Sequence, residues 1–329
     1  MNFIRAALLA GLLAGSAGPA GAADLIPFRY GQTASTLRSV FSLPIFVAER
    51  EGYFTQEGLA VKVVPINGGT DKMIAALHDD TVDVTHVSMP FLIQANLNGS
   101  DSVAIAAEFN NPIYSLVVKP DIKSFADLKG RQLGMAVAAD TIAISIRKLL
   151  AKNGLSDSDF RVKEMVGTPV RFNCLKQGEC DAVPLGQPED FMAVDMGYRI
   201  LGISSDAVPD FLYTVTAVRR SWGEAHKDAV VRYVKALAAA FRFIRDPGKR
   251  EAVVRTIVET TDASETIARA ILKLYFEPER GVLPKQGEIS LAGLAQVISF
   301  MREGGAIKGD APSAERFVDL QYLKAAGVQ

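Results

Sequence analysis

The chain is poor in the side chains that most often carry chemistry. Its 329 residues include three histidines, two cysteines and one tryptophan. His78, His86 and His226 do not stand at the spacing of metal ligands, so we expect no metal site. There is no G-x-x-x-x-G-K-[ST] motif for ATP hydrolysis and no G-x-S-x-G elbow. We therefore predict no catalytic residue and no cofactor.

Charge and hydropathy argue against nucleic-acid binding and against transmembrane segments. The formal net charge is −1, so nucleic acid is a poor partner. Beyond the N-terminus, no apolar run approaches the roughly 20 residues that span a bilayer. The N-terminus has the pattern of an export signal: Arg5, an apolar run over residues 6–14, and Ala20-Gly21-Ala22 as the cleavage site. We predict a signal peptide over residues 1–22 and a periplasmic protein, with a hydrophobic N-terminal anchor as the alternative.

The two cysteines stand close together in the sequence "CLKQGEC". Cys174 falls late in a predicted helix and Cys180 at the entry to the next strand. A tight turn at Gly178 could bring them within disulfide range, and an exported protein meets oxidising conditions. Two buried free thiols are the alternative, and the sequence leaves both open.

Two segments of the chain repeat each other. "VPINGGT" ends at Thr70 and "MVGTP" contains Thr168, and 168 − 70 gives an offset of 98 residues. The same offset relates further pairs of identical residues: Gly69 and Gly167, Leu77 and Leu175, Asp83 and Asp181, Pro90 and Pro188. The repeat predicts one strand–loop–helix–strand unit built twice. We interpret the repeated aspartates, at helix-to-strand junctions, as structural.

The order of predicted elements indicates an α/β protein of two lobes. Strands and helices alternate from Phe28 to about Val218, which is typical of parallel sheets covered on both faces, and helices follow to the end. The later helices are predicted over 222–245, 249–261, 263–275, 288–303 and 312–325. Pro112–Asp121 and Pro209–Val218 are natural crossovers. We predict lobe 1 over 23–117 and 213–329, lobe 2 over 118–212, and a hinged cleft between two parallel-rich sheets.

Ligands of open α/β sheets bind beyond the carboxyl ends of the strands, so the loops at those ends are the candidate site. Lobe 1 supplies Ser35–Pro44, Gly68–Thr70, Ser88–Pro90 and Asn110-Asn111, and lobe 2 supplies Ala138–Thr141, Gly167–Pro169 and Leu185–Pro188. The ligand-binding residues predicted from these loops are Arg38, Ser39, Phe41, Gly68, Gly69, Thr70, Ser88, Met89, Asn110, Ala139, Asp140, Thr141, Gly167, Thr168 and Gln187. Ordinary strand-to-helix turns are the alternative for either Gly-Thr loop.

Several of these residues have a plainer interpretation. Arg38 could hold an anion by a bidentate fork, or be a solvated loop arginine. Phe41 could stack on a planar ligand, or anchor its loop in the core. Asp140 is more simply the N-cap of the next helix; in the cleft it would favour an amine or hydroxyl. Arg171 is expected on the solvated side of its helix. The site is therefore predicted to be polar and mixed in charge.

Three stretches resemble one protein family in the right order. "PIFVAEREGYFTQEGLAVKVV" (Pro44–Val64), "LKQGECDAVPLGQPEDFMAVDMGYRIL" (Leu175–Leu201) and "VDLQYLKAAG" (Val318–Gly327) are similar to periplasmic substrate-binding proteins of ABC transporters. The similarity is to the branch with receptors for sulfonates, taurine, nitrate and thiamine-precursor pyrimidines. One departure is Asp80, where that family usually has glycine, which affects only a helix end.

The resemblance implies the type II-like periplasmic binding fold and a partner. A monomer would close on a small solute and deliver it to an ABC permease in the inner membrane. The solute expected first is an organic acid or sulfonate, and the second choice is an aromatic or pyrimidine-like solute. An enzyme on the same scaffold is the competing hypothesis. Yeast-type pyrimidine synthases resemble this fold but depend on a cysteine-rich cluster that this chain lacks. A chemosensory receptor would use the same cleft.

Overall fold

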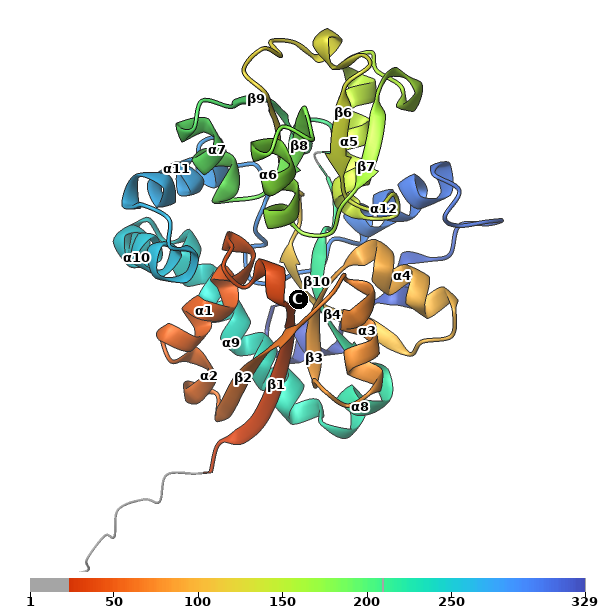
Figure 1. The fold of residues 1–329 in the computed structure, drawn as a ribbon. Coiled ribbons are helices and arrows are strands. Elements are labelled where there is room, and N and C mark those ends of the chain that lie inside the picture. Colours follow the sequence, from red (N-terminus) through yellow and green to blue (C-terminus); the bar gives the residue numbers. More distant parts are fainter. Residues whose placement is uncertain (1–23, 209, 329) are drawn as a thin grey trace, which may run out of the picture.

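The computed structural model describes residues 24–208 and 210–328 (Figure 1). The predicted signal peptide lies outside the described residues. The described chain folds into two five-stranded mixed sheets covered by helices. Figure 1 shows the second sheet with α5, α6 and α7 above the first, α10 and α11 along one side, and α12 along the other.

The two sheets share one plan. The strand order is β2-β1-β3-β10-β4 in the first sheet and β7-β6-β8-β5-β9 in the second. In each, the strand that arrives from the other half (β10 or β5) runs antiparallel to both neighbours. The bounds are β1 Ile26–Thr33, β2 Leu59–Ile66, β3 Val84–Ser88, β4 Ser102–Phe109, β5 Ser115–Val118, β6 Gln132–Met135, β7 Arg161–Glu164, β8 Ala182–Leu185, β9 Arg199–Ile203 and β10 Thr214–Arg219. The prediction of parallel-rich sheets joined by two crossover strands is confirmed.

The repeated aspartates show why the 98-residue offset exists. The Asp83 carboxylate accepts the Arg29 N–H at 2.6 Å, and the Asp83 N–H donates to the Arg29 carbonyl at 2.9 Å. Asp181 makes the same reciprocal pair with Gln132, at 2.9 and 2.8 Å. Each aspartate therefore ties the start of its strand to the neighbouring strand. All four residues of β5 pair in the second sheet, so a boundary at 117/118 cuts that strand.

Helices cover both faces of each sheet. Their bounds are α1 Leu43–Arg50, α2 Tyr53–Gln56, α3 Asp71–His78, α4 Met89–Leu97, α5 Thr141–Lys152, α6 Thr168–Lys176, α7 Glu189–Asp195, α8 Arg220–Ala225, α9 Lys227–Arg245, α10 Arg250–Thr261, α11 Glu265–Phe276, α12 Leu291–Glu303 and α13 Gln321–Ala325. The long helix α9 packs its apolar stripe under the first sheet, where the ring of Tyr233 stacks on Phe28 at 5.2 Å. The core is thus continuous from sheet to helix layer.

Two predicted helices are interrupted. The expected helix 222–245 breaks at His226, whose ring stacks on Trp222 at 4.2 Å while Nδ1 contacts the Trp222 carbonyl. The expected helix 312–325 is interrupted: Ala314–Phe317 form only a short 3-10 helix, and Val318 then makes a parallel bridge with Ala104 of β4. Only α13 remains helical after it. The first break accompanies a local contact between residues four apart, and the second comes from a tertiary contact with β4.

Two local features left open by the sequence are settled. Cys174 and Cys180 form a disulfide with their Cα atoms 5.3 Å apart, from the end of α6 to the entry of β8. Asp80 takes a φ of 52° after α3. Glycine would adopt that left-handed conformation without strain, which explains why a glycine is expected there, and aspartate is one of the few residues that tolerates it.

Candidate functional site

One cavity of about 330 Å³ lies where the strand ends of the two halves meet. Its walls come from both: Thr33, Ser35, Thr36, Gly69, Thr70, Asp71, His86, Ser88, Phe91, Tyr213 and Thr214 from the first half and its returning segment, and Tyr114, Ala136, Val137, Asp140, Ile142, Met165, Val166, Gly167, Thr168 and Arg171 from the second. The volume suits a small molecule.

The two Gly-Thr loops approach each other across this cavity. Gly69 and Gly167 both line it, each just before the first turn of a helix, α3 or α6. A Cβ built on Gly167 would lie 3.5 Å from the side chain of Ser35, and one on Gly69 would lie 3.9 Å from Val166. Gly167 also has a φ of 90°, which favours glycine. These distances are ordinary van der Waals contacts, so the two loops stand side by side, and at Gly167 it is the backbone conformation that requires glycine.

Arg171 is the buried cation of the cavity wall, and the expectation of a solvated side chain was wrong. It is 1% exposed, and burial lowers its pKa. Its Nε donates to the Pro184 carbonyl at 2.8 Å, Nη1 to the Met165 carbonyl at 3.3 Å and Nη2 to the Thr168 hydroxyl at 3.1 Å. A guanidinium has five N–H groups, so 5 − 3 leaves two that no described residue accepts. Arg171 of α6 therefore points inward, where the Pro184 carbonyl of β8 accepts its hydrogen bond.

Two carboxyl groups act electrostatically on this arginine. Asp140 lines the cavity and also caps α5, since its Oδ1 accepts the Ile142 N–H at 2.8 Å. Burial raises the pKa of Asp140, although the charge of Arg171 opposes the rise. Burial likewise raises the pKa of Glu189 to about 7. The Asp140 and Glu189 carboxyl groups thus oppose the positive charge of Arg171 electrostatically.

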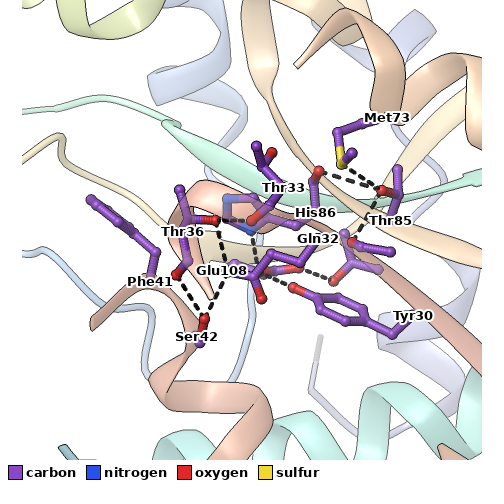
Figure 2. A network of polar contacts seen from close by, with 12 residues as sticks. Tyr30, Gln32, Thr33, Thr36, Phe41, Ser42, Met73, Thr85, His86 and Glu108 are labelled. Atoms are coloured by element: carbon purple, nitrogen blue, oxygen red, sulfur yellow. Dashed lines mark hydrogen bonds and ion pairs between the residues drawn. The ribbon is translucent and has the colours of Figure 1, made fainter. Parts of the chain in front are cut away.

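A buried carboxylate orients the histidine of the opposite wall. Glu108 is fully buried and accepts hydrogen bonds from the Tyr30 hydroxyl at 3.0 Å and the Thr216 hydroxyl at 2.6 Å. His86 Nδ1 lies 2.6 Å from the same carboxylate (Figure 2). Because Nδ1 is held by Glu108, the other ring nitrogen of His86 is free to serve the cavity that this residue lines.

Aromatic rings stand where the two crossover segments meet. The Tyr114 and Tyr213 hydroxyls are 2.8 Å apart, and both residues line the cavity. Behind them Phe41 stacks on Tyr114 at 5.6 Å and meets Phe109 edge-on at 5.0 Å. Phe41 is 3% exposed and has the anchoring role that the sequence left as its alternative. Tyr114 and Tyr213, backed by Phe41, thus form an aromatic wall of the cavity where the crossover segments meet.

The structure brings part of the predicted set together. Six of the predicted residues line the cavity: Gly69, Thr70, Ser88, Asp140, Gly167 and Thr168. Ser39, Phe41, Met89 and Thr141 are buried beside it, and Gly68 and Ala139 flank lining residues. Gln187 is buried in bonds to the Ile113 carbonyl, Asp190 and Tyr275. Arg38 pairs with Asp262 on the surface, and Asn110 lines another hollow, near Arg280.

Sequence reasoning missed His86, Arg171, Tyr114, Tyr213 and Thr214 as lining residues. For His86 a signal was present. Strand alternation puts it on the same face as Ser88, and Glu108 is a lone carboxylate in the otherwise apolar run "SVAIAAEF". A buried carboxylate needs a partner, and the histidine is the nearest candidate in the sheet. For Arg171 no local signal distinguishes the buried face of α6.

Other features of the chain bear on cofactors and membranes. Within residues 24–208 and 210–328, no three His, Cys, Asp or Glu side chains gather as metal ligands would. Across the same ranges, every helix is too short or too polar for a bilayer span.

Comparison with solved structures identifies the fold. The ligand-binding component of an ABC-type import system from Staphylococcus aureus is 13% identical, with a TM-score of 0.75 over 93% of this chain and 100% of that one. The periplasmic aliphatic sulphonate binding protein SsuA from Escherichia coli is 15% identical, with a TM-score of 0.69 over 90% of this chain and 92% of that one. At these identities the likeness shows the periplasmic binding protein fold.

Sequence comparison identifies the family. A curated relative, 4-amino-5-hydroxymethyl-2-methylpyrimidine phosphate synthase from Schizosaccharomyces pombe, is 22% identical over 63% of this chain. The chain spans 63% of that relative's length. A family model described as NMT1/THI5 like matches residues 41–249, which is more than half of the chain. The chain therefore belongs to the NMT1/THI5-like family, on a periplasmic binding protein fold.

Proposed function

We propose that the protein is an exported solute receptor that closes on a small organic acid or sulfonate and delivers it, unchanged, to an ABC importer permease. The proposal includes the two lobes, 23–117 with 213–329 and 118–212, and a monomer in the periplasm. The binding-protein fold supports a binding role. The observation that carries the proposal is the cavity between the halves with Arg171 buried in its wall.

Arg171 favours a singly charged acid. Its two remaining N–H groups suit a carboxylate or sulfonate, whose oxygens accept charge-assisted hydrogen bonds. The Thr168 hydroxyl and the N-terminus of α6 stand on the same wall. Asp140 already balances the arginine, so a group with two negative charges would be repelled there. The cavity thus fits one acid group on a small organic body.

Closure follows from the two-sided lining. A solute that contacts both halves uses all its contacts only when they approach, so it shifts an open–closed equilibrium toward the closed form. Contacts already join the halves near the cavity, such as the Val40 N–H to the Gln187 carbonyl at 3.3 Å. A permease could then distinguish the loaded receptor by its shape.

The test is a search for the solute followed by proof that it is not consumed. Protein from a native preparation is denatured, and the released solute is identified by mass spectrometry. Thermal shift with alkanesulfonates, short carboxylates and 4-aminopyrimidines follows; a solute at 100 times its dissociation constant stabilises by about 2.7 kcal/mol. We expect stabilisation by an acid that is recovered intact. Turnover of that acid, or no shift with any acid, would contradict the proposal.

A pyrimidine-like solute or substrate is the second candidate. Phe91, Tyr114 and Tyr213 line the cavity and offer faces for a planar ring. The relative named as a pyrimidine phosphate synthase points to the same ligand class and to an enzyme. The thermal-shift series distinguishes the candidates. Stabilisation by the aminopyrimidines alone would favour the ring-binding alternative, and product formation would favour the enzyme.

A further inference from the structure

We propose that Ser88, Thr214 and His86 form a second recognition subsite, which binds a neutral hydrogen-bonding group at the end of the solute remote from its acid. The inference rests on the proposed acid receptor and makes its ligand two-headed. The acid would lie against the wall of Arg171. The neutral group, such as a hydroxyl or a carbonyl, would lie on the floor formed by β3 and β10.

The first observation is a pair of unused hydroxyls. Ser88 is 5% exposed and Thr214 is 1% exposed, and both line the cavity. Neither hydroxyl has a hydrogen-bond partner among the residues that the structure describes. They are direct cross-strand partners on the antiparallel pair β3 and β10, so they stand side by side. A buried hydroxyl without a partner is costly, and a solute that bonds it would remove that cost.

The second observation is that His86 completes the same face. It lies two residues before Ser88 and is the cross-strand partner of Thr216, whereas Ser88 pairs with Thr214. Glu108 holds its Nδ1 at 2.6 Å, and Nε2 makes no hydrogen bond within the described part of the chain. The strand register therefore puts the three polar groups on one face of the β3–β10 pair. Figure 2 shows the buried Glu108 carboxylate that holds the His86 ring.

The charge of this face selects a neutral group. The charged side chains that line the described cavity are Asp71, His86, Asp140 and Arg171. Asp71 opens α3 and contacts Lys72, and Asp140 and Arg171 belong to the opposite wall. His86 is thus the ionisable group of the β3–β10 floor, and Glu108 balances any charge that it carries. The floor therefore offers hydrogen bonds but no excess positive charge. An acid group placed there would lose its hydration without gaining a counter-charge.

A stability test needs no ligand. Thr214→Val and Ser88→Ala remove hydroxyls that bond no group of the described protein, so each is expected to leave the unfolding midpoint of solute-free protein unchanged within about 2 °C. Thr216→Val is the matched control, because its hydroxyl donates to Glu108 at 2.6 Å. That change is expected to lower the midpoint. If Thr214→Val lowers it as much as Thr216→Val does, the hydroxyl serves the fold and the proposal fails.

A binding test uses matched probes. Alkanesulfonates of two to four carbons are compared with the same compounds bearing a terminal hydroxyl, by calorimetry. The wild type is expected to prefer the hydroxylated probe by about 10- to 100-fold at the best chain length, and the Ser88→Ala, Thr214→Val double variant to lose that preference. Equal affinity of the wild type for both series overturns the subsite but leaves the acid receptor standing. No binding of either series, together with no stabilisation by any carboxylate in the thermal-shift series, overturns the acid receptor and this inference with it.

Discussion

Replacing Arg171 by methionine tests which arginine binds the acid. The variant loses the two N–H groups left for the solute, each worth about 1.5–3 kcal/mol as a charged hydrogen bond, so affinity should fall by about 3 kcal/mol, or roughly 100-fold. It also removes the donors to the Pro184 and Met165 carbonyls and the Thr168 hydroxyl. We therefore expect about 3 kcal/mol less stability as well.

Two companion variants separate binding from folding. Arg171→Lys keeps a cation but not the planar fork, and should lose about 10-fold in affinity. Arg38→Met is the matched control, because Arg38 is 68% exposed and its pair with Asp262 stands on the surface. Such pairs contribute about 0–1 kcal/mol, so neither affinity nor stability should change measurably.

The assay is calorimetric titration with the acid found by the solute screen, at a temperature where every variant is folded. Urea unfolding measures stability separately. The reasoning would be refuted if Arg171→Met bound the acid as tightly as the wild type. A loss of affinity in Arg38→Met alone would instead place the anion site in the loop that the sequence first suggested.

Three further predictions concern pH, the disulfide and the loop glycines. Burial raises the pKa of Glu189 from 4.5 to about 7, so the stability of the wild type falls as pH rises from 4.5 to 7. Glu189→Gln should therefore stabilise the protein by up to about 3 kcal/mol near pH 8 but hardly at all near pH 4. Equal effects of the substitution in urea unfolding at both pH values would reject this. Reducing the Cys174–Cys180 bond, which closes a sequence separation of 6, should lower the free energy of unfolding by about 2 kcal/mol; an unchanged urea midpoint with and without reductant would argue against it. Gly167→Ala should lower both stability and affinity. Gly130→Ala, also at positive φ but with open space around it, should lower stability alone. Matching Kd values for the two variants would show that the Gly167 loop does not contact the solute.

The sequence was sufficient for the fold because its strongest signals are local or periodic. The strands Ser115–Val118 and Ala182–Leu185, for example, are short apolar runs bounded by turn residues, which is the local pattern of a buried strand. The 98-residue offset predicted that the two halves share one arrangement of elements, and the strand orders of the two sheets are equivalent. The break at His226 was not predicted, because its immediate neighbours include neither the glycine nor the proline that usually signals a helix end, and a stacked Trp222–His226 pair is not such a signal.

The cavity was harder to predict because lining depends on which face of an element turns inward. Gly69 and Gly167 are at strand ends, so the fold rule for α/β sheets finds them. Arg171 and Arg38 are each one arginine near a strand end, and the sequence does not say which is buried. Arg171 is buried, with its Nε bonded to the Pro184 carbonyl of a neighbouring strand. Arg38 stays at the surface, where it pairs with Asp262 at the end of α10.

The central claim is that one solute clamps the two halves together, and solution scattering measures this directly. Radii of gyration are compared for solute-free protein and for protein saturated with the acid, with Arg171→Met at the same acid concentration as the control. The account predicts a smaller radius for the loaded wild type and no change for the variant. An identical radius with and without bound acid, at confirmed saturation, would contradict it.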